Sequence, residues 1–241
     1  MSNTSPRYYS GDKPNPKAHE ILFTLSQTFH LQPSDYSSLM VQKEKKNPFE
    51  TLVVTVLSQN STDKLAVKSF ENLDVALGGI SPRKLALAPI RKIRDAIKIG
   101  GLQEQKASGL KNLSRKLLKE YNGKLDQILD KPFDEARDLL MQLPQVGPKT
   151  ADVVLVTAAG KSTIPVDTHV DRVSRRLGLA PLKGGYEKVR QSLQSLYKPS
   201  EYHRVHLLLI AHGRAYCAAQ NPKCSVCPVE NYCPYPYKKK E

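Results

Sequence analysis

The sequence lacks a long apolar run. Its longest stretches without Lys, Arg, Asp or Glu, such as Thr51 to Thr62, are shorter than the roughly 17–25 apolar residues that a membrane-spanning helix needs. Residues 1–17 are polar and contain proline, and they lack the apolar core of a secretory signal. We therefore expect a chain that neither crosses a membrane nor is exported.

Cysteine is absent from the first 216 residues, and all four cysteines lie between Cys217 and Cys233. A disulfide framework would join distant loops, so this clustering favours a metal site in a reducing compartment. The spacing Cys217-x6-Cys224-x2-Cys227-x5-Cys233 indicates a four-thiolate site. Zinc is the commonest occupant of such a site, an iron–sulfur cluster is an alternative, and disulfide pairing is a weaker one.

Acidic residues are few. The 23 Asp and Glu stand against 37 Lys and Arg, which gives a net charge of +14 and a pI near 9.6. Such an excess indicates a polyanionic partner, with nucleic acid first and an anionic membrane as the alternative. From Ser81 to Lys119, eleven basic residues stand against two acidic ones, and we expect this segment to face phosphates because like charges repel unless a polyanion neutralises them. The eleven are Arg83, Lys84, Arg91, Lys92, Arg94, Lys98, Lys106, Lys111, Arg115, Lys116 and Lys119.

Apolar residues recur with helical spacing along most of the chain. One amphipathic pattern comprises Ile21, Leu22, Leu25 and Phe29, and a second, after Pro48, comprises Leu52, Val53, Val56 and Leu57. Similar patterns, separated by Gly, Pro or Asn, predict helices at about 62–77, 82–88, 89–97, 103–120, 134–142, 149–159, 168–177, 184–196 and 201–213. Alternating strand patterns are scarce. The sequence therefore predicts an all-α protein, preceded by a flexible tail at residues 1–16.

The segment Leu143–Ala151 lies between two helical patterns and has the features of a tight helix–turn–helix joint. Gly147 allows a sharp backbone and the close approach of a ligand, and Pro148 presets the backbone for the next helix. Such a turn exposes main-chain N–H groups beside a positive helix terminus, which can hold a phosphate without contacting bases. An ordinary helical hairpin with no ligand is the alternative.

Lys149 and Asp167 are the candidate catalytic residues in this region. The helix dipole and partial burial both disfavour an ammonium group at the start of a helix, so we expect the pKa of Lys149 to fall toward the range of a neutral nucleophile that can form a Schiff base. A simple phosphate contact is the alternative. Asp167 begins the next helix, where a carboxylate normally caps the free N–H groups, and a cap held rigid and ionised can also stabilise developing positive charge.

The motifs LPQVGPKTADVV and VDTH, followed by four cysteines, resemble the endonuclease III family of helix-hairpin-helix DNA glycosylases. The resemblance implies that Lys149 attacks C1′ of a damaged nucleotide, and that Asp167 assists loss of the base. It also implies that Gln145, Val146, Gly147 and Lys149 of the hairpin grip the DNA backbone. The implied fold has two lobes. One is a six-helix barrel at 41–161, and the other combines 17–40 with 162–241.

The same resemblance implies a [4Fe–4S] cluster at residues 217–233, held by Cys217, Cys224, Cys227 and Cys233. It further implies two residues that enter the duplex when a nucleotide is flipped out. Asn60, in the segment Leu57–Asp63, stands where the family usually has a glutamine that fills the vacated space. Leu102, after Gly101, corresponds to a leucine that wedges into the opposite strand. Asp171 is an acidic departure from the family pattern, with no effect that the sequence predicts.

The resemblance as a whole implies a bifunctional DNA glycosylase and AP lyase of base excision repair, acting on duplex DNA with damaged bases or abasic sites. We expect it to remove oxidised pyrimidines and then to cleave the abasic strand by β-elimination. We expect a monomer, without a membrane partner, in the nucleoid-associated cytoplasm of a prokaryote. The alternatives are a mismatch-directed thymine, uracil or adenine glycosylase of the same fold, a non-catalytic damage-binding module, and a zinc-ribbon transcription factor.

Overall fold

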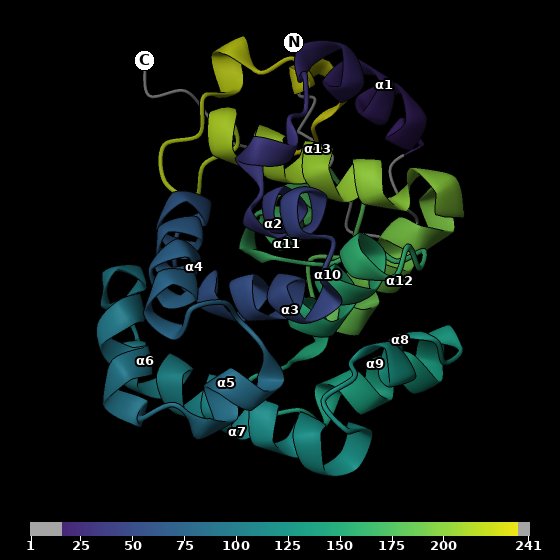
Figure 1. The fold of residues 1–241 in the computed structure, drawn as a ribbon. Coiled ribbons are helices and arrows are strands. Elements are labelled where there is room, and N and C mark those ends of the chain that lie inside the picture. Colours follow the sequence, from purple (N-terminus) through teal and green to yellow (C-terminus); the bar gives the residue numbers. More distant parts are fainter. Residues whose placement is uncertain (1–15, 236–241) are drawn as a thin grey trace, which may run out of the picture. The chain divides into compact units, whose positions relative to one another are not determined.

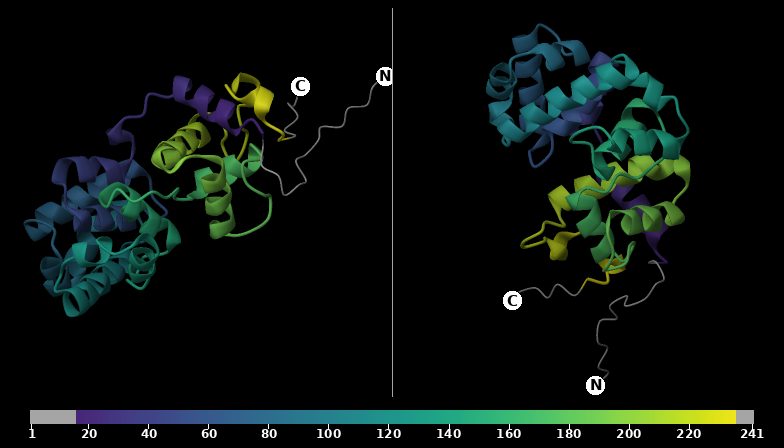
Figure 2. Two further views of the ribbon diagram at one scale, coloured as in Figure 1. Left: turned by 90° about the vertical axis from the view of Figure 1, so that its right-hand side faces the viewer. Right: turned by 90° about the horizontal axis from the view of Figure 1, so that it is seen from below.

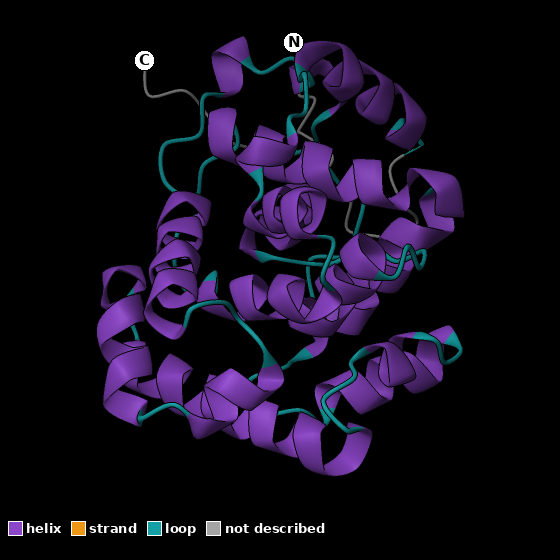
Figure 3. Cartoon of the chain, viewed as in Figure 1, coloured by secondary structure: helices purple, strands orange, loops and turns teal. Residues whose placement is uncertain are grey.

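The computed structural model describes residues 16–235, and within this range every regular element is helical (Figure 3). The expected flexible tail at 1–16 lies almost entirely outside the described residues. The chain divides into two compact units (Figure 1). Unit 1 combines Met1–Leu31 with Ser162–Glu241, and unit 2 is Gln32–Lys161.

Unit 2 contains nine α-helices, of which six have nine residues or more. They are α2 (Ser37–Lys45), α3 (Pro48–Leu57), α4 (Asp63–Leu77), α5 (Pro82–Leu87), α6 (Ile90–Ile97), α7 (Gln103–Tyr121), α8 (Asp126–Leu129), α9 (Phe133–Met141) and α10 (Pro148–Ala158). Helix α7 packs against both α5 and α6, and these segments stay together in both views of Figure 2, where they are coloured blue to teal.

The core of unit 2 is built around α3, whose residues are buried with the exception of Pro48 and Glu50. Asn47 caps this helix through hydrogen bonds from the backbone N–H groups of Phe49 and Glu50, and Pro48 occupies the first helical position, where its missing N–H costs nothing. A strongly apolar helix of this kind is stable only inside a core. Helices α2, α4, α7 and α10 all pack against it.

Within residues 16–235, unit 1 contains four α-helices, and the last of them is followed by a segment with short 3-10 turns. The helices are α1 (Ala18–Thr28), α11 (Thr168–Arg176), α12 (Tyr186–Leu196) and α13 (Tyr202–Ala215). Helix α13 packs against α1 and α11. Beyond α13, the residues that carry the cysteines form only the turns Cys224–Val226 and Glu230–Tyr232.

Most of the helices agree with the sequence patterns, and two differences have physical causes. The pattern missed α2, because Val41 is its only fully buried aliphatic residue and gives no helical repeat. It also missed α8, which has one turn. The boundary expected at residues 40–41 would cut α2, whereas the compact units divide between Leu31 and Gln32 because α2 packs along α3.

Candidate functional site

The turn between α9 and α10 has its unusual backbone at Gln145 rather than at Gly147. Gln145 adopts a left-handed conformation with φ 66°, which is costly for a residue with a Cβ atom. Gly147 has φ −94° and ψ −179°, an extended conformation that any residue can adopt. The expectation that Gly147 supplies the sharp turn is therefore wrong. Gly147 is exposed, however, and nothing lies within 4 Å of the position of a Cβ there, so its main chain is open to a close-approaching ligand.

Lys149 lies directly after this open main chain, as the second residue of α10. Gly147 is the N-cap, Pro148 takes the first helical position as predicted, and the Lys149 side chain is half-buried. The free N–H groups of the first helical turn and the positive end of the helix dipole meet at this point. The local geometry thus places an amine beside a main-chain site suited to an anion.

Gln59 connects this turn to the segment that carries Asn60. Its side-chain amide donates hydrogen bonds to the Gln145 carbonyl oxygen at 2.8 Å and to Thr150 Oγ1 at 3.2 Å. The sequence motif points to Asn60 and not to its neighbour Gln59. Gln59 is a second amide side chain in the same motif, but no local pattern indicates its hydrogen-bond partner 86 residues away.

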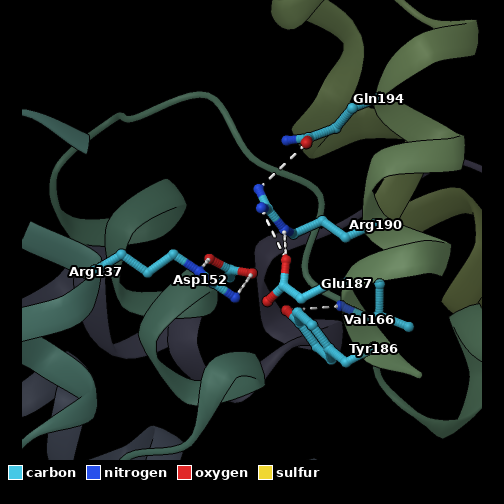
Figure 4. A network of polar contacts seen from close by, with 7 residues as sticks. All are labelled: Arg137, Asp152, Val166, Tyr186, Glu187, Arg190 and Gln194. Carbon is cyan, nitrogen blue, oxygen red and sulfur yellow. Dashed lines mark hydrogen bonds and ion pairs between the residues drawn. The ribbon is translucent and has the colours of Figure 1, made fainter. Parts of the chain in front are cut away.

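A buried ion pair joins the two helices that flank the turn (Figure 4). Arg137 Nε of α9 donates to Asp152 Oδ1 of α10 at 2.7 Å, and Arg137 Nη2 donates to Asp152 Oδ2 at 3.5 Å. Arg137 is 8% exposed and Asp152 is fully buried. Removing one partner of such a pair leaves a buried charge without compensation, so we expect the pair to restrict the separation of α9 and α10. No local sequence pattern indicates this pair.

Asn60 and Leu102 share an unusual geometry. Both are exposed, and both adopt left-handed backbone conformations, with φ 50° and φ 52°. Lys106 lies beneath both segments, only 2% exposed, and its Nζ donates to the carbonyl oxygens of Leu57 at 2.8 Å and Gly100 at 3.1 Å. Burial lowers the pKa of Lys106. The expectation that Lys106 faces phosphate is therefore wrong.

Three other lysines of the Ser81–Lys119 segment also donate to backbone carbonyls. Lys84 donates to Gly78, Lys111 to Ala88, and Lys116 to Gln142. Lysines near helix ends commonly satisfy such carbonyls. The exposed basic residues of the segment are Arg83, Lys84, Arg91, Lys92, Lys98, Arg115 and Lys119. The surface charge available to a polyanion is therefore smaller than the sequence count suggests.

Asp167, in unit 1, is the N-cap of α11 as predicted, and its Oδ1 accepts a 2.7 Å hydrogen bond from the backbone N–H of Val170. The residues before it are also fixed, because Val166 N–H donates to Tyr186 Oη at 3.3 Å (Figure 4), and the Pro165 carbonyl lies 2.8 Å from His206 Nδ1. One carboxylate oxygen is thus held by the cap in a rigid backbone setting.

Arg172 connects the start of α11 to the first cysteine. It donates to the carbonyl oxygens of Cys217 at 2.9 Å and Thr168 at 3.3 Å, and it lies 3.1 Å from His169 Nδ1. Burial lowers the pKa of His169. Asp171, whose effect the sequence left open, pairs with Arg175 at 2.9 Å and so serves within α11.

The four cysteines are free thiols, each half-buried, along one pocket that Arg176, His212 and Tyr216 also line. Burial raises the pKa of the Cys224, Cys227 and Cys233 thiols, the last to about 11. Burial lowers the pKa of His212 to about 4. Thiols in such surroundings are readily deprotonated only when a metal binds them or a cation lies beside them. Arg176 supplies one cation, with Nη1 3.5 Å from Cys217 Sγ.

Comparison with known proteins places these features in a family. The model of the HhH-GPD superfamily of base excision DNA repair proteins matches residues 53–199. Endonuclease III of Sulfolobus acidocaldarius is 34% identical over 218 residues, which cover 90% of this chain and 96% of that protein.

Two solved structures resemble the whole chain. One is a non-covalent endonuclease III–DNA complex, with a TM-score of 0.77 and 32% identity, covering 92% of this chain and 95% of that one. The other is a trapped endonuclease III–DNA covalent intermediate, an estranged-adenine complex, with a TM-score of 0.72 and 33% identity, covering 89% of this chain and 94% of that one.

Proposed function

The chain belongs to the HhH-GPD superfamily of base excision DNA repair proteins, and on this premise we propose that Lys149 and Asp167 carry the chemistry of a bifunctional DNA glycosylase and AP lyase. The observation that carries the proposal is the position of Lys149. It is a half-buried amine, second in α10, directly beside the exposed main chain of Gly147. This arrangement suits a nucleophile that acts next to a bound phosphate.

Lys149 would act in two steps. Its neutral Nζ attacks C1′ of the damaged nucleotide, the C1′–N bond breaks, and the base leaves with the bonding electrons and a proton. The Nζ lone pair then opens the sugar ring by breaking the C1′–O4′ bond, O4′ takes up a proton, and an iminium ion forms between Nζ and C1′. The iminium ion acidifies the C2′ proton; loss of that proton and cleavage of the C3′–O bond then break the strand on its 3′ side by β-elimination. The main chain at 145–147 would hold the phosphate during both steps.

Asp167 would assist the departure of the base. A carboxylate stabilises positive charge that develops on the sugar as the C1′–N bond lengthens. The N-cap hydrogen bond to Val170 occupies one of its oxygens, so the second oxygen keeps acceptor capacity. Capping and catalysis are therefore compatible at this residue.

The four cysteines would hold a [4Fe–4S] cluster. Within residues 16–235, no three His, Cys, Asp or Glu side chains gather closely enough to hold a single metal ion. The four thiols that line one pocket would supply the ligands of such a cluster, one for each iron. When bound, the cluster would supply a cross-link for the loops at 217–233 rather than chemistry on the DNA.

The proposed substrate is duplex DNA that contains oxidised pyrimidines or abasic sites. The proposal takes the protein to act as a monomer in the nucleoid-associated cytoplasm of a prokaryote. No helix among residues 16–235 is long and apolar enough to cross a membrane.

A mismatch-directed glycosylase remains the second candidate, because Asn60 is one methylene shorter than the glutamine usual in the family.

Borohydride trapping tests the nucleophile directly. Incubating the protein with thymine glycol duplex and sodium borohydride should give a covalent protein–DNA adduct, because the reductant converts the imine into a stable amine. Lys149→Gln should bind the same duplex and give no adduct. A wild-type preparation that excises base but gives no adduct, or a Lys149→Gln variant that cleaves at the parental rate, would contradict the proposal.

A panel of lesions separates the two candidate substrate classes. Thymine glycol and dihydrouracil duplexes should be cleaved faster than duplexes with uracil or thymine opposite guanine, or adenine opposite oxidised guanine. The reverse order would favour the mismatch enzyme.

Protein purified anaerobically should be brown, with broad visible absorption and about four irons per chain for a [4Fe–4S] cluster. A colourless protein that contains zinc would rule the cluster out.

A further inference from the structure

Lys106 binds two segments that are distant in sequence. Its ammonium group donates to the carbonyl oxygen of Leu57, the last residue of α3, at 2.8 Å and to that of Gly100 at 3.1 Å. The side chain reaches both from α7, at 2% exposure. All of these atoms belong to unit 2. One charged group therefore fixes the end of α3 relative to the turn before α7.

Placing an ammonium group there is expensive, and the hydrogen bonds offset the cost. Burial disfavours the charged form and lowers the pKa of Lys106. The carbonyl at the C-terminus of α3 carries partial negative charge from the helix dipole, which favours a cation. A methionine of similar length would fill the space without this desolvation cost. What the ammonium group adds is its hold on the two carbonyls.

Each of these carbonyls precedes one of the two exposed residues with a left-handed backbone, Asn60 and Leu102, which we call the tips. Asn60 follows Leu57 by three residues, and Leu102 follows Gly100 by two. Both tips are exposed and both carry unfavourable positive φ angles, which persist only where the surrounding structure enforces them. Gly100 also packs closely against Ser69, because a Cβ there would lie 2.5 Å from Ser69 Oγ.

We propose that Lys106 is a positioning residue for nucleotide flipping, which sets the separation of the Asn60 and Leu102 tips so that both enter the duplex together. The inference rests on the proposed function. Extruding a nucleotide costs a few kcal/mol, and inserted side chains recover part of that cost only where they match the vacated space. A loosened pair of tips would therefore slow base extrusion and leave the imine chemistry of Lys149 unchanged.

The test compares two substrates of one variant. Lys106→Met should slow single-turnover excision of thymine glycol from duplex DNA by about 10- to 100-fold, the cost of a misplacement near 1 Å. Strand cleavage at a preformed abasic site in single-stranded DNA needs no extrusion from a duplex, and it should change by no more than about twofold. With 2-aminopurine beside the lesion, the fluorescence rise that reports unstacking should be smaller and slower. Lys106→Arg, which keeps the charge, should restore part of the excision rate.

Two further variants separate positioning from simple loss of stability. Leu117→Ala removes a fully buried side chain from the same helix, three turns away, and should destabilise unit 2 by about 2–5 kcal/mol without touching either segment. At a temperature where both proteins remain folded, it should retain the parental ratio of the two activities. Gly100→Ala keeps Lys106 and places a methyl group 2.5 Å from the present position of Ser69 Oγ. If the main chain of Gly100 moves in response, rather than the Ser69 hydroxyl, duplex excision should be lost selectively.

The outcomes are distinct. The inference is overturned if Lys106→Met lowers both activities in the same proportion, or if it lowers neither. Should Lys106→Met fail to fold, Gly100→Ala and Lys106→Arg decide by the same ratio. Failure of the proposed function would appear in the wild-type protein itself, as absence of excision and of trapping on every lesion, before any variant is compared.

Discussion

The two units hold their functional segments in different ways. In unit 2, the turn that carries Lys149 and the tips at Asn60 and Leu102 are fixed by protein groups alone, through Gln59, Lys106 and the Arg137–Asp152 pair. In unit 1, the start of α11 is similarly fixed, but the cysteine segment has only two three-residue turns and no regular helix. Long-range side-chain contacts thus fix the candidate segments of unit 2, whereas the cysteine segment of unit 1 is the part that the proposed cluster would cross-link.

The units also differ in titratable composition. All six histidines lie in unit 1, and unit 2 has none. The hydrophobic cluster that runs from Val41 to Leu155 lies wholly in unit 2. Unit 2 is therefore expected to respond to core and ion-pair substitutions, and unit 1 to acid and to loss of the proposed cluster.

The largest expected effect in this comparison comes from Arg137→Met. The variant leaves the Asp152 carboxylate buried without its partner, so the free energy of unfolding should fall by about 3–5 kcal/mol. Urea unfolding measures the loss, and amide hydrogen exchange should locate it in unit 2. The double variant Arg137→Met/Asp152→Leu should recover part of the loss. A single variant that loses less than about 1 kcal/mol would show that the pair does not hold α9 to α10.

Asp167→Asn should affect activity and spare stability. Asparagine caps a helix about as well as aspartate, so the Val170 hydrogen bond and the melting temperature should be retained. Loss of the charge should lower base excision by about 10²- to 10³-fold, or about 2.7–4 kcal/mol of transition-state stabilisation. Single-turnover excision and thermal melting are the measurements. A variant with parental excision would remove Asp167 from the proposed chemistry.

Acid should weaken unit 1 before unit 2. Burial lowers the pKa of His169 and His203, so below about pH 6.5 the unfolded chain binds more protons than the folded one, and stability falls as the pH falls. Glu50 in unit 2 contributes with the opposite sign. Burial raises its pKa, so its contribution to stability increases as the pH falls. Amide exchange at pH 7.5 and 5.5 should show loss of protection in unit 1 alone, and His203→Gln should reduce it. Equal loss in both units would contradict the contrast.

The smallest expected effect concerns charge on unit 2. Lys98 is exposed four residues before Leu102, so Lys98→Gln should reduce the slope of log affinity for duplex DNA against log salt by about 1. Lys116→Gln is the matched comparison, since Lys116 already donates to Gln142 and pairs with Glu120, and its effect should be smaller. Equal changes would mean that the basic segment acts only through net charge.

Several features could be predicted from the sequence because their causes are local. The helices from α3 to α13 agree with apolar repeats and with Gly, Pro and Asn at their ends, apart from the one-turn α8. Pro148 at the first position of α10 and Asp167 as the N-cap of α11 follow from residue type alone. The helix α2 was not predicted, because its sequence lacks the apolar repeat that indicates a helix.

The sequence by itself determined the helical class, the caps, the positions of Lys149 and Asp167 on their helices, and the cysteine spacing, since each depends on residues within one or two turns. Only the tertiary structure decided which polar side chains are internal. Lys106 counts as one more positive charge in the sequence, yet it lies buried against a carbonyl 49 residues away. Gln145 rather than Gly147 takes the left-handed turn. Burial and long-range hydrogen bonding depend on how distant segments pack, and no local pattern encodes them.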